Sequence, residues 1–313
     1  MTCHNCRIEC KRAGKHRNGL RRFRCTQCKK SFTEPHERPL DEMRLPLAKA
    51  EMILKMLCEG VSVRSIERLT EVHRDTILRL LVKAGQRCEK LLGEKIRNIP
   101  VKDVELDEIW HFCFKKQKAL RPGDDPSFGD SWCFTAIDRH SKLILNFALG
   151  KRDQATTNIF IEGLRQATLS QPFQVTADGF PAYPSAIENT LSDRCDFAQL
   201  VKVYRASPEG ECRYSPAEVV STERVPVIGN PDPKRVCTSI VERQNLTMRM
   251  QMRRLTRLTN AFSKKWENLW AALCLHFAWY NFCRVHTSLR VTPAMEAGIT
   301  DRVWDLVEIL AQG

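Results

Sequence analysis

The chain has 313 residues, 42% of them hydrophobic, with 14 cysteines and a formal net charge of +13. It is too long for one small core, so we expect two or three domains. The charge points to a polyanion, nucleic acid first, because clustered Lys and Arg release counterions from phosphates. The N-terminal segment lacks the charged, apolar and small-residue order of a signal peptide. The longest apolar stretch, LWAALCLHFAWYNF, is short and contains His276 and Asn281, so no membrane partner is expected. In a cytoplasmic protein the cysteines are metal ligands or core thiols.

Two cysteine pairs mark the N-terminal segment. Cys3-x-x-Cys6 and Cys25-x-x-Cys28 have the spacing of a four-cysteine zinc site. Gly and Asn turns between the pairs predict short strands, as in a zinc ribbon over residues 1–39. The zinc ion is expected to be structural, because catalytic zinc needs an open coordination position. Eleven Lys and Arg against three Glu make this segment basic, and its basic loop either contacts DNA phosphates or is only solvated.

A helix-turn-helix unit is predicted over residues 40–95. LPLAKAEMILKMLCEG has the apolar spacing of a helix that ends at Gly60, Ser62 can cap the helix VRSIERL, and VHRDTILRLLVKAG predicts a third helix closed by Gly85. Such a unit is either a DNA-binding module or a plain helical bundle. Its position beside a basic zinc ribbon favours DNA binding.

The second and third helices are expected to pack through apolar side chains and to leave polar ones outside. The inward-facing apolar residues are expected at Ile66, Leu69, Val72, Ile77 and Leu80. The polar side chains left outside suit a recognition helix in the major groove: His73, Arg74, Thr76 and Arg79.

From Val101 the pattern changes to strands. VKDVELDEIWHFCF, SWCFTAIDRH and KLILNFALG predict a three-stranded meander. A helix at about residues 155–169, the strand FQVTADG and a helix near Ala182 follow. This order predicts an α/β fold, a mixed sheet with helices on its faces. Irregular chain is expected near Pro35–Pro46 and around residues 205–236.

Acidic residues occur in the first and fourth of these strands. Alternation puts Asp103, Glu105 and Asp107 on one face of the first strand. Asp178 falls where the fourth strand gives way to a loop, a position that favours functional groups. The pattern does not choose among the acids of the first strand, and a solvated strand face explains them equally well.

A basic helix is predicted over TSIVERQNLTMRMQMRRL, residues 238–255. Glu242 is its only acid, and Leu246, Arg249 and Arg253 share its face. The arginines either hold a DNA strand that leads to the acid, or Glu242 is an ordinary acid at a helix N-terminus, where the dipole favours it. The neighbouring stripe is apolar: Val241, Met248, Met252 and Leu255.

Three motifs resemble those of DDE transposases with an RNase H-like fold: LDEIW at Asp107, TADGFPAY at Asp178 and ERQNLTMRMQMRRLTRLTNAFSK at Glu242. The last block, with its E-R-x-N-L-x-x-R start and later S-K, is similar to transposases of the insertion sequence one family. Those proteins also carry a zinc ribbon and a helix-turn-helix, so the resemblance spans nearly the whole chain. It implies an RNase H-like domain over residues 96–295, with an insertion at about 204–236, and a C-terminal helix over 296–313.

The resemblance implies that Asp107, Asp178 and Glu242 are catalytic and hold two Mg²⁺ or Mn²⁺ ions. Oxygen ligands suit these ions, which can neutralise the charge that develops during phosphodiester cleavage. Arg249 is the basic residue seven positions after the last acid, and Arg253 is expected to bind DNA with it. YNFCRVHTSL and TPAMEAG resemble the C-terminal features of many insertion-sequence transposases, where His286 either approaches the active site or serves packing.

The resulting prediction is a transposase that binds the terminal inverted repeats of an insertion sequence and catalyses metal-dependent strand cleavage and strand transfer. Its expected partners are double-stranded DNA, as element ends and as target, and further copies of itself, because paired ends must be brought together. We expect a prokaryotic, cytoplasmic, nucleoid-associated protein. Two alternatives stay open: a DNA-binding regulator with an inactive nuclease-like domain, and a metal-dependent endonuclease that does not join DNA.

Overall fold

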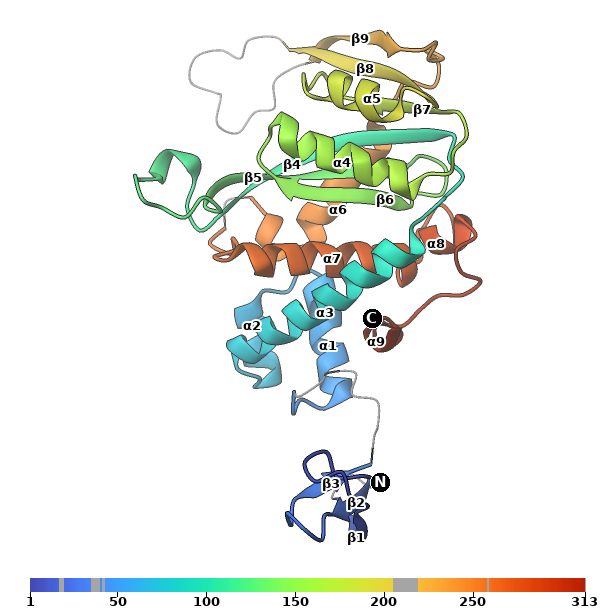
Figure 1. The fold of residues 1–313 in the computed structure, drawn as a ribbon. Coiled ribbons are helices and arrows are strands. Elements are labelled where there is room, and N and C mark those ends of the chain that lie inside the picture. Colours follow the sequence, from blue (N-terminus) through green and yellow to red (C-terminus); the bar gives the residue numbers. More distant parts are fainter. Residues whose placement is uncertain (17–19, 35–39, 41–42, 205–218, 258, 313) are drawn as a thin grey trace. The chain divides into compact units, whose positions relative to one another are not determined.

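The structure, a computed structural model, describes residues 1–16, 20–34, 40, 43–204, 219–257 and 259–312. It divides into two compact units, Met1–Met43 and Arg44–Gly313. The smaller unit is a three-stranded antiparallel sheet in the order β1-β2-β3 (Figure 1). Its strands are β1 (Lys11–Lys15), β2 (Arg21–Arg24) and β3 (Ser31–Thr33).

The strands expected between the two cysteine pairs are therefore present. Most strand side chains in this unit are exposed, and its interior consists of cysteines with Ile8, Phe23 and Phe32 packed around them. A sheet of this size buries too little apolar surface to be stable alone, so a bound metal ion is the expected source of its stability.

Three helices begin the larger unit, as the sequence predicts: α1 (Leu47–Cys58), α2 (Val63–Thr70) and α3 (Arg74–Lys95). Gly60 follows α1 with a φ of +76°, a conformation that glycine adopts without strain. The Ser62 side chain accepts a hydrogen bond of 3.1 Å from the N–H of Ser65 and so caps α2. Ile66, Val72, Ile77 and Leu80 are buried as expected.

Two expectations about these helices are wrong. Gly85 does not end α3, which continues ten residues further to Lys95. A Cβ atom at Gly85 would lie 2.4 Å from Cα of Ala271, so this glycine allows α3 to pack closely against another helix. Leu69, expected to face inward, is 68% exposed.

The centre of the larger unit is a six-stranded mixed sheet in the order β6-β5-β4-β7-β8-β9. The β4–β5–β6 meander is antiparallel, β7 and β8 run parallel to β4, and β9 is antiparallel to β8. This is an RNase H-like sheet extended at one edge by β9, and it confirms the predicted fold class. The strands are β4 (Asp103–Cys113), β5 (Gly129–Asp138), β6 (Ile144–Gly150), β7 (Phe173–Ala177), β8 (Cys195–Tyr204) and β9 (Val219–Ile228).

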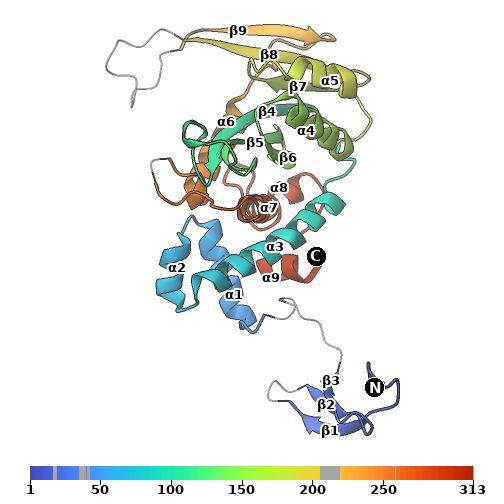
Figure 2. The ribbon, with the colours of Figure 1, turned by 60° about the vertical axis from the view of Figure 1, so that its left-hand side comes forward.

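Helices cover both faces of this sheet (Figure 2). One face carries α4 (Gln154–Ala167) and α5 (Tyr183–Leu191), where Phe134 of β5 packs against Phe160 of α4. The other face carries two helices, where Phe147 of β6 packs against Phe277. These helices are α6 (Ser239–Gln251) and α7 (Trp266–Phe282).

The helix α7 lies between the sheet and α3 (Figure 1) and is buried continuously from Ala271 to Phe282, which accounts for the mainly apolar sequence of this part. No helix in the described part of the chain is long and apolar enough to cross a membrane. The remaining short elements are η1 (Gln117–Ala119), η2 (Arg253–Leu255), α8 (Pro293–Glu296) and α9 (Leu306–Gln312), of which α9 packs on α3 and α1.

Two segment predictions need correction. The irregular stretch expected at 205–236 contains the regular strand β9, which accommodates Pro226 because it is an edge strand; residues 205–218, 35–39 and 41–42 lie outside the described residues. The basic helix stops at Gln251 rather than Leu255, because Met252 leaves helical geometry with φ −116° and ψ 98°. This bend lets Met252 and Leu255 both be buried.

Candidate active site

The two predicted aspartates lie on neighbouring parallel strands. Asp107 is in the middle of β4, and Asp178 directly follows β7. Glu105 pairs with Thr176 in this ladder, so continuing the register by two residues places Asp107 beside Asp178. The strand order of the sheet thus brings together two acids that are far apart in the sequence.

A third carboxylate in this group is Glu108, which the sequence analysis did not select. One ligand oxygen from each of Asp107, Glu108 and Asp178 lies within 4.8 Å of the others. Glu108 points toward the α4–α5 face of the sheet, the opposite face from Asp107. Its carboxylate nevertheless lies near that of Asp178, which follows the end of β7. The Oε1 atom of Glu108 is buried, and its carboxyl group lies beside the hydroxyl of Tyr183.

Glu242 does not belong to this group in the described structure. It lies in the first turn of α6, and its Oε1 accepts hydrogen bonds from Lys202 of β8 and, at 2.7 Å, from the hydroxyl of Thr238. Its charge nevertheless contributes to raising the pKa of Asp107. The predicted triad is therefore two acids in contact and a third nearby that is paired with a lysine.

Arg152 supplies positive charge to the acid group. Its Nε donates to Oε2 of Glu108 at 3.1 Å, and its Nη2 lies 3.8 Å from Oδ2 of Asp178. The guanidinium carbon lies 4.1 Å from the ring centre of Phe180 and 5.1 Å from that of Trp132, as in cation–π contacts. One cation held in this way offsets only part of the negative charge of the group.

The pKa values of the acids reflect burial and crowding. Burial, followed by the charges of Glu108, Asp178 and Glu242, raises the pKa of Asp107 to about 7. Burial and the charge of Asp178 also raise the pKa of Glu108. Carboxylates in this state bind a proton or a metal cation more readily than isolated ones, so the donor set fits a hard divalent ion such as Mg²⁺.

The other acids of β4 have structural partners. The Oε2 atom of Glu105 accepts hydrogen bonds of 2.8 and 3.0 Å from the N–H groups of Ile240 and Val241, and so caps the N-terminus of α6. Asp103 accepts from Arg235 at 2.8 Å and bonds with His140 at 2.9 Å. Both acids are buried, so the alternative of a solvated acidic strand face is wrong.

Helix α6 connects to Asp107 through a further residue of the motif at Glu242. The Nδ2 atom of Asn245 donates to Oδ2 of Asp107 at 2.7 Å, and the other carboxylate oxygen accepts from the N–H of Glu108 at 2.8 Å. Asn245 is one turn after Glu242 on a face that approaches β4. Its role was not predicted, although it belongs to the quoted E-R-x-N motif.

The predicted basic residues after Glu242 separate in the structure. Arg249 is half-buried on α6, with Nη1 3.5 Å from the carbonyl of Leu255, and burial lowers its pKa. Arg253 is exposed on η2, beyond the end of α6, so the prediction that Arg249 and Arg253 share one helix face is wrong.

His286 forms a hydrogen bond of 3.0 Å with Ser288, and its pKa is lowered by burial and by the charges of Lys142, Arg284 and Arg243. None of its described contacts involves the acid group.

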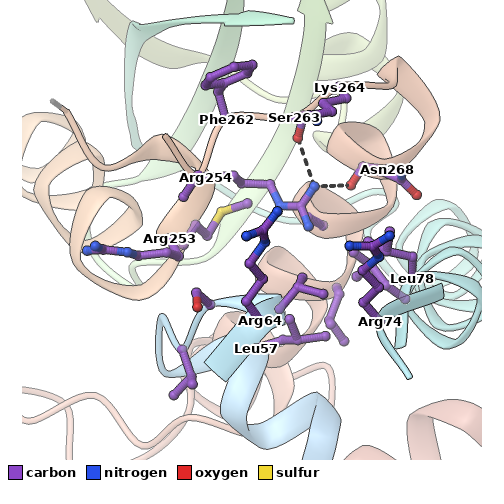
Figure 3. A pocket seen from close by; sticks show the side chains of 18 of the residues that line it. Leu57, Arg64, Arg74, Leu78, Arg253, Arg254, Phe262, Ser263, Lys264 and Asn268 are labelled. Atoms are coloured by element: carbon purple, nitrogen blue, oxygen red, sulfur yellow. Dashed lines mark hydrogen bonds between the residues drawn. The ribbon is translucent and has the colours of Figure 1, made fainter. Parts of the chain in front are cut away.

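The expected recognition residues lie at the start of α3. His73, Arg74 and Arg79 are exposed, and Thr76 is half-buried. His73 caps the helix, since its Nδ1 accepts from the N–H of Asp75 at 3.3 Å. Arg74 points into a cavity on the side facing α7 (Figure 3).

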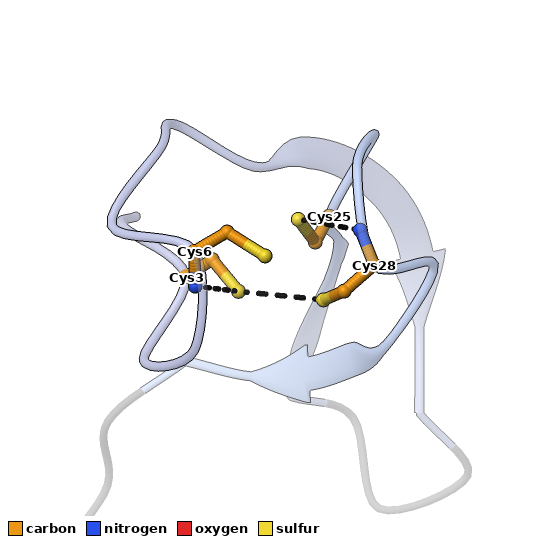
Figure 4. A group of neighbouring side chains, drawn as sticks. All are labelled: Cys3, Cys6, Cys25 and Cys28. Carbon is orange, nitrogen blue, oxygen red and sulfur yellow. Dashed lines mark hydrogen bonds between the residues drawn. The ribbon is translucent and has the colours of Figure 1, made fainter.

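The four predicted zinc ligands converge in the smaller unit (Figure 4). The sulfur atoms of Cys3, Cys6, Cys25 and Cys28 all lie within 4.8 Å of one another, and Cys3 and Cys28 are 3.6 Å apart. Tetrahedral zinc with Zn–S bonds of about 2.3 Å requires sulfurs about 3.8 Å apart. The N–H of Cys28 lowers the pKa of Cys25 to about 6, which favours the thiolate. The cluster is compatible with structural zinc.

Comparisons with known proteins add similarity of fold only. No protein-family model matches the sequence, and no curated protein matches it. Among solved structures, the chain is similar to a piggyBac transposase synaptic complex with hairpin DNA, with 11% identity, a TM-score of 0.42, and coverage of 84% of this chain and 68% of that one. It is also similar to a Mos1 mariner paired end complex with Mn, with 15% identity and a TM-score of 0.21, covering 52% of this chain and 61% of that one.

The chain thus spans less than two thirds of the Mos1 chain. A Mos1 strand transfer complex gives similar values, 16% identity and a TM-score of 0.22, with 52% and 60% of the two chains covered. These TM-scores are low, and the assignment of the sheet as RNase H-like depends on its own strand order and directions.

Proposed function

We propose that the protein is a DDE-type transposase, similar to those of the insertion sequence one family, which cleaves DNA at the ends of a mobile element and joins them to target DNA. The observation that carries the proposal is the meeting of Asp107 and Asp178, with Glu108, at one end of an RNase H-like sheet. Acids brought this close are costly unless a cation joins them. The motif resemblance at all three predicted acids supports the same function.

Asp107, Asp178 and Glu242 would hold the divalent ions, two Mg²⁺ or Mn²⁺ per site. When bound, such ions activate the attacking oxygen and neutralise the charge on the leaving oxygen of an in-line phosphoryl transfer. Asn245 keeps Asp107 oriented toward the site through its hydrogen bond. Glu242 must exchange Lys202 for a metal ion to complete the set.

The remaining predicted residues bind DNA in this proposal. Arg249 and Arg253 follow Glu242 and bind phosphates of the strand that enters the site. Residues 40–95 recognise the terminal inverted repeats through His73, Arg74, Thr76 and Arg79, and the zinc ribbon of residues 1–39 adds phosphate contacts. Synapsis of two element ends requires at least a dimer.

The decisive experiment incubates the purified protein with labelled duplexes made from the DNA that flanks its gene, in Mg²⁺. A transposase cleaves at the element end, exposes a 3′ hydroxyl and joins it to a second duplex. Asp107→Asn and Asp178→Asn should abolish both products while retaining end binding. Asp193→Asn serves as the control, because this exposed acid forms a surface ion pair with Arg165 and is not part of the acid group.

The outcomes separate the alternatives. Nicks without joined products would assign a metal-dependent endonuclease. End binding with neither product from the wild-type protein would assign a regulator whose nuclease-like domain is inactive. Cleavage that survives in either variant would contradict the proposed role of that aspartate.

A further inference from the structure

A cavity of about 890 Å³ lies in the larger unit, away from the acid group (Figure 3). Its walls come from the α1–α2 turn, the beginnings of α2 and α3, the η2 segment, residues 259–264 and α7. The cavity is therefore formed by helices α1 to α3 together with α7 and the segment that joins α6 to α7. None of the acids of the candidate active site lines this cavity, although Arg74 and Arg253, which bind DNA in the proposed function, do.

Cationic side chains dominate the charge of the cavity. Five line it against a single carboxylate, that of Asp75: Arg64, Arg74, Arg253, Arg254 and Lys264. Arg74 has Asp75 at 3.8 Å. Arg64, Arg253 and Lys264 are exposed and have no carboxylate partner among the described residues. A concave surface with this charge attracts an anion from solution.

Arg254 is held by two hydrogen bonds within the cavity wall. One nitrogen, Nη1, donates to the hydroxyl of Ser263 at 2.8 Å and to the carbonyl of Asn268 at 3.0 Å (Figure 3). Both acceptors are uncharged, and in the described part of the chain no carboxylate forms an ion pair with this guanidinium. Burial lowers its pKa to about 10, so it remains charged at neutral pH. The two bonds fix a guanidinium whose other donors remain for a ligand.

Between these cations the walls are apolar. Apolar residues of the lining include Leu57, Leu78, Leu81, Ala261, Phe262 and Leu275. Inorganic phosphate would leave such a surface uncovered. A flat apolar group with a phosphate attached would cover both kinds of surface.

His276 of α7 also lines the cavity and is 1% exposed. Neither of its ring nitrogens has a hydrogen-bond partner among the described residues. A buried polar group without a partner costs free energy. One donor and one acceptor on a neutral imidazole match the polar edge of a nucleobase.

We propose that this cavity binds one nucleotide outside a base-paired stack, with the base against the apolar wall and His276 and the phosphate against Arg254 and Arg64. The nucleotide can come from a free mononucleotide or from an unpaired position in a DNA strand. A fully paired duplex does not fit, because its bases are stacked and only its phosphates reach the surface of a cavity.

Binding can be tested without catalysis, by titrating the full chain with deoxyadenosine monophosphate in zinc-containing, magnesium-free buffer. Arg64→Gln should weaken binding at least about tenfold, since a charge-assisted hydrogen bond contributes that much. Arg68→Gln is the matched control, an exposed arginine one turn further along α2 that does not line the cavity. Ala261→Trp should abolish binding by placing an indole ring in part of the space proposed for the base.

A second arm uses short duplexes that carry 2-aminopurine either paired or unpaired at one end. A fluorescence change with the unpaired probe only, lost in Ala261→Trp, assigns the DNA source, whereas a response to mononucleotide alone assigns the free source. Inorganic phosphate that binds as tightly as the mononucleotide would overturn the role of the base. No binding of either probe, or equal binding by Arg64→Gln and wild type, would overturn the proposal. All readouts are independent of strand cleavage, so they separate this proposal from the function of the acid group.

Discussion

Asn245 donates a hydrogen bond of 2.7 Å to Asp107, and so connects helix α6 to the central strand of the sheet. Removal of this bond in Asn245→Ala should lower the cleavage rate by about 10- to 100-fold, the value of one hydrogen bond to a charged group. The acidic limb of the pH–rate profile should move to higher pH, since the bond favours the ionised form. Thr247→Ala on the same helix should stay near wild type. An unchanged rate and profile in Asn245→Ala would refute the positioning role.

The third carboxylate can be identified by comparing Glu242→Gln with Glu108→Gln. If Glu242 is a metal ligand, Glu242→Gln loses cleavage and keeps DNA binding. Glu108→Gln should instead weaken metal affinity by about 10- to 100-fold, as expected for a group that supports the ligands, and activity should return at high Mg²⁺. The opposite pattern, an inactive Glu108→Gln beside an active Glu242→Gln, would place Glu108 in the metal site.

In the protein without divalent metal, the contribution of Asp107 to stability should fall as pH rises from about 4 to 7. The pKa of Asp107 is raised to about 7 in the folded state, so the folded protein binds more protons than the unfolded chain in this window. Asp107→Asn should flatten this dependence and raise the melting temperature at pH 7. Mg²⁺ should stabilise the wild type more at pH 8 than at pH 5. Thermal melts at several pH values measure both effects, and a wild-type profile in Asp107→Asn would contradict them.

Zinc removal should unfold the smaller unit and leave the larger one folded. The interior of residues 1–43 consists mainly of cysteine side chains, whereas the larger unit has its own sheet and helices. Limited proteolysis after chelation should therefore release the N-terminal segment alone, and end binding should weaken. Retained protection of residues 1–33 after confirmed zinc loss would show that the sheet is stable without metal.

The close contact between α3 and α7 predicts opposite effects for two glycines of one helix. Gly85→Ala should destabilise the protein by about 1–3 kcal/mol, because the new Cβ would lie 2.4 Å from Cα of Ala271. Gly93→Ala should stabilise it by about 0.5–1 kcal/mol, because a Cβ there has no neighbour within 4 Å and alanine favours the helix. Denaturant unfolding measures both. Equal effects at the two positions would argue against tight packing at Gly85.

Local patterns predicted the sheet and the strand-end position of Asp178, whereas Asp107 was selected among the acids of its strand only by the motif resemblance. Strand alternation and the strand-to-loop position of Asp178 are local features, and the parallel β4–β7 register then follows from the RNase H-like topology. Glu108 was missed because alternation places it on the opposite face from Asp107, and only its longer side chain brings its carboxylate to the same strand end.

Features that depend on tertiary contacts were the ones predicted wrongly. Gly85 has the appearance of a helix stop, but in the structure it marks the closest approach of α3 to α7. The bend at Met252 depends on burying Met252 and Leu255 together. The pairing of Lys202 with Glu242 joins residues forty positions apart, and no local spacing indicates it.

The cap that Glu105 forms on α6 has a kinetic consequence. Two main-chain bonds hold the start of this helix on β4, so we expect the Glu242 carboxylate to leave Lys202 by torsions of its own partly exposed side chain, with the helix held in place. Such torsions take picoseconds to nanoseconds. Rotation of this side chain is therefore not expected to limit the rate of the proposed reaction.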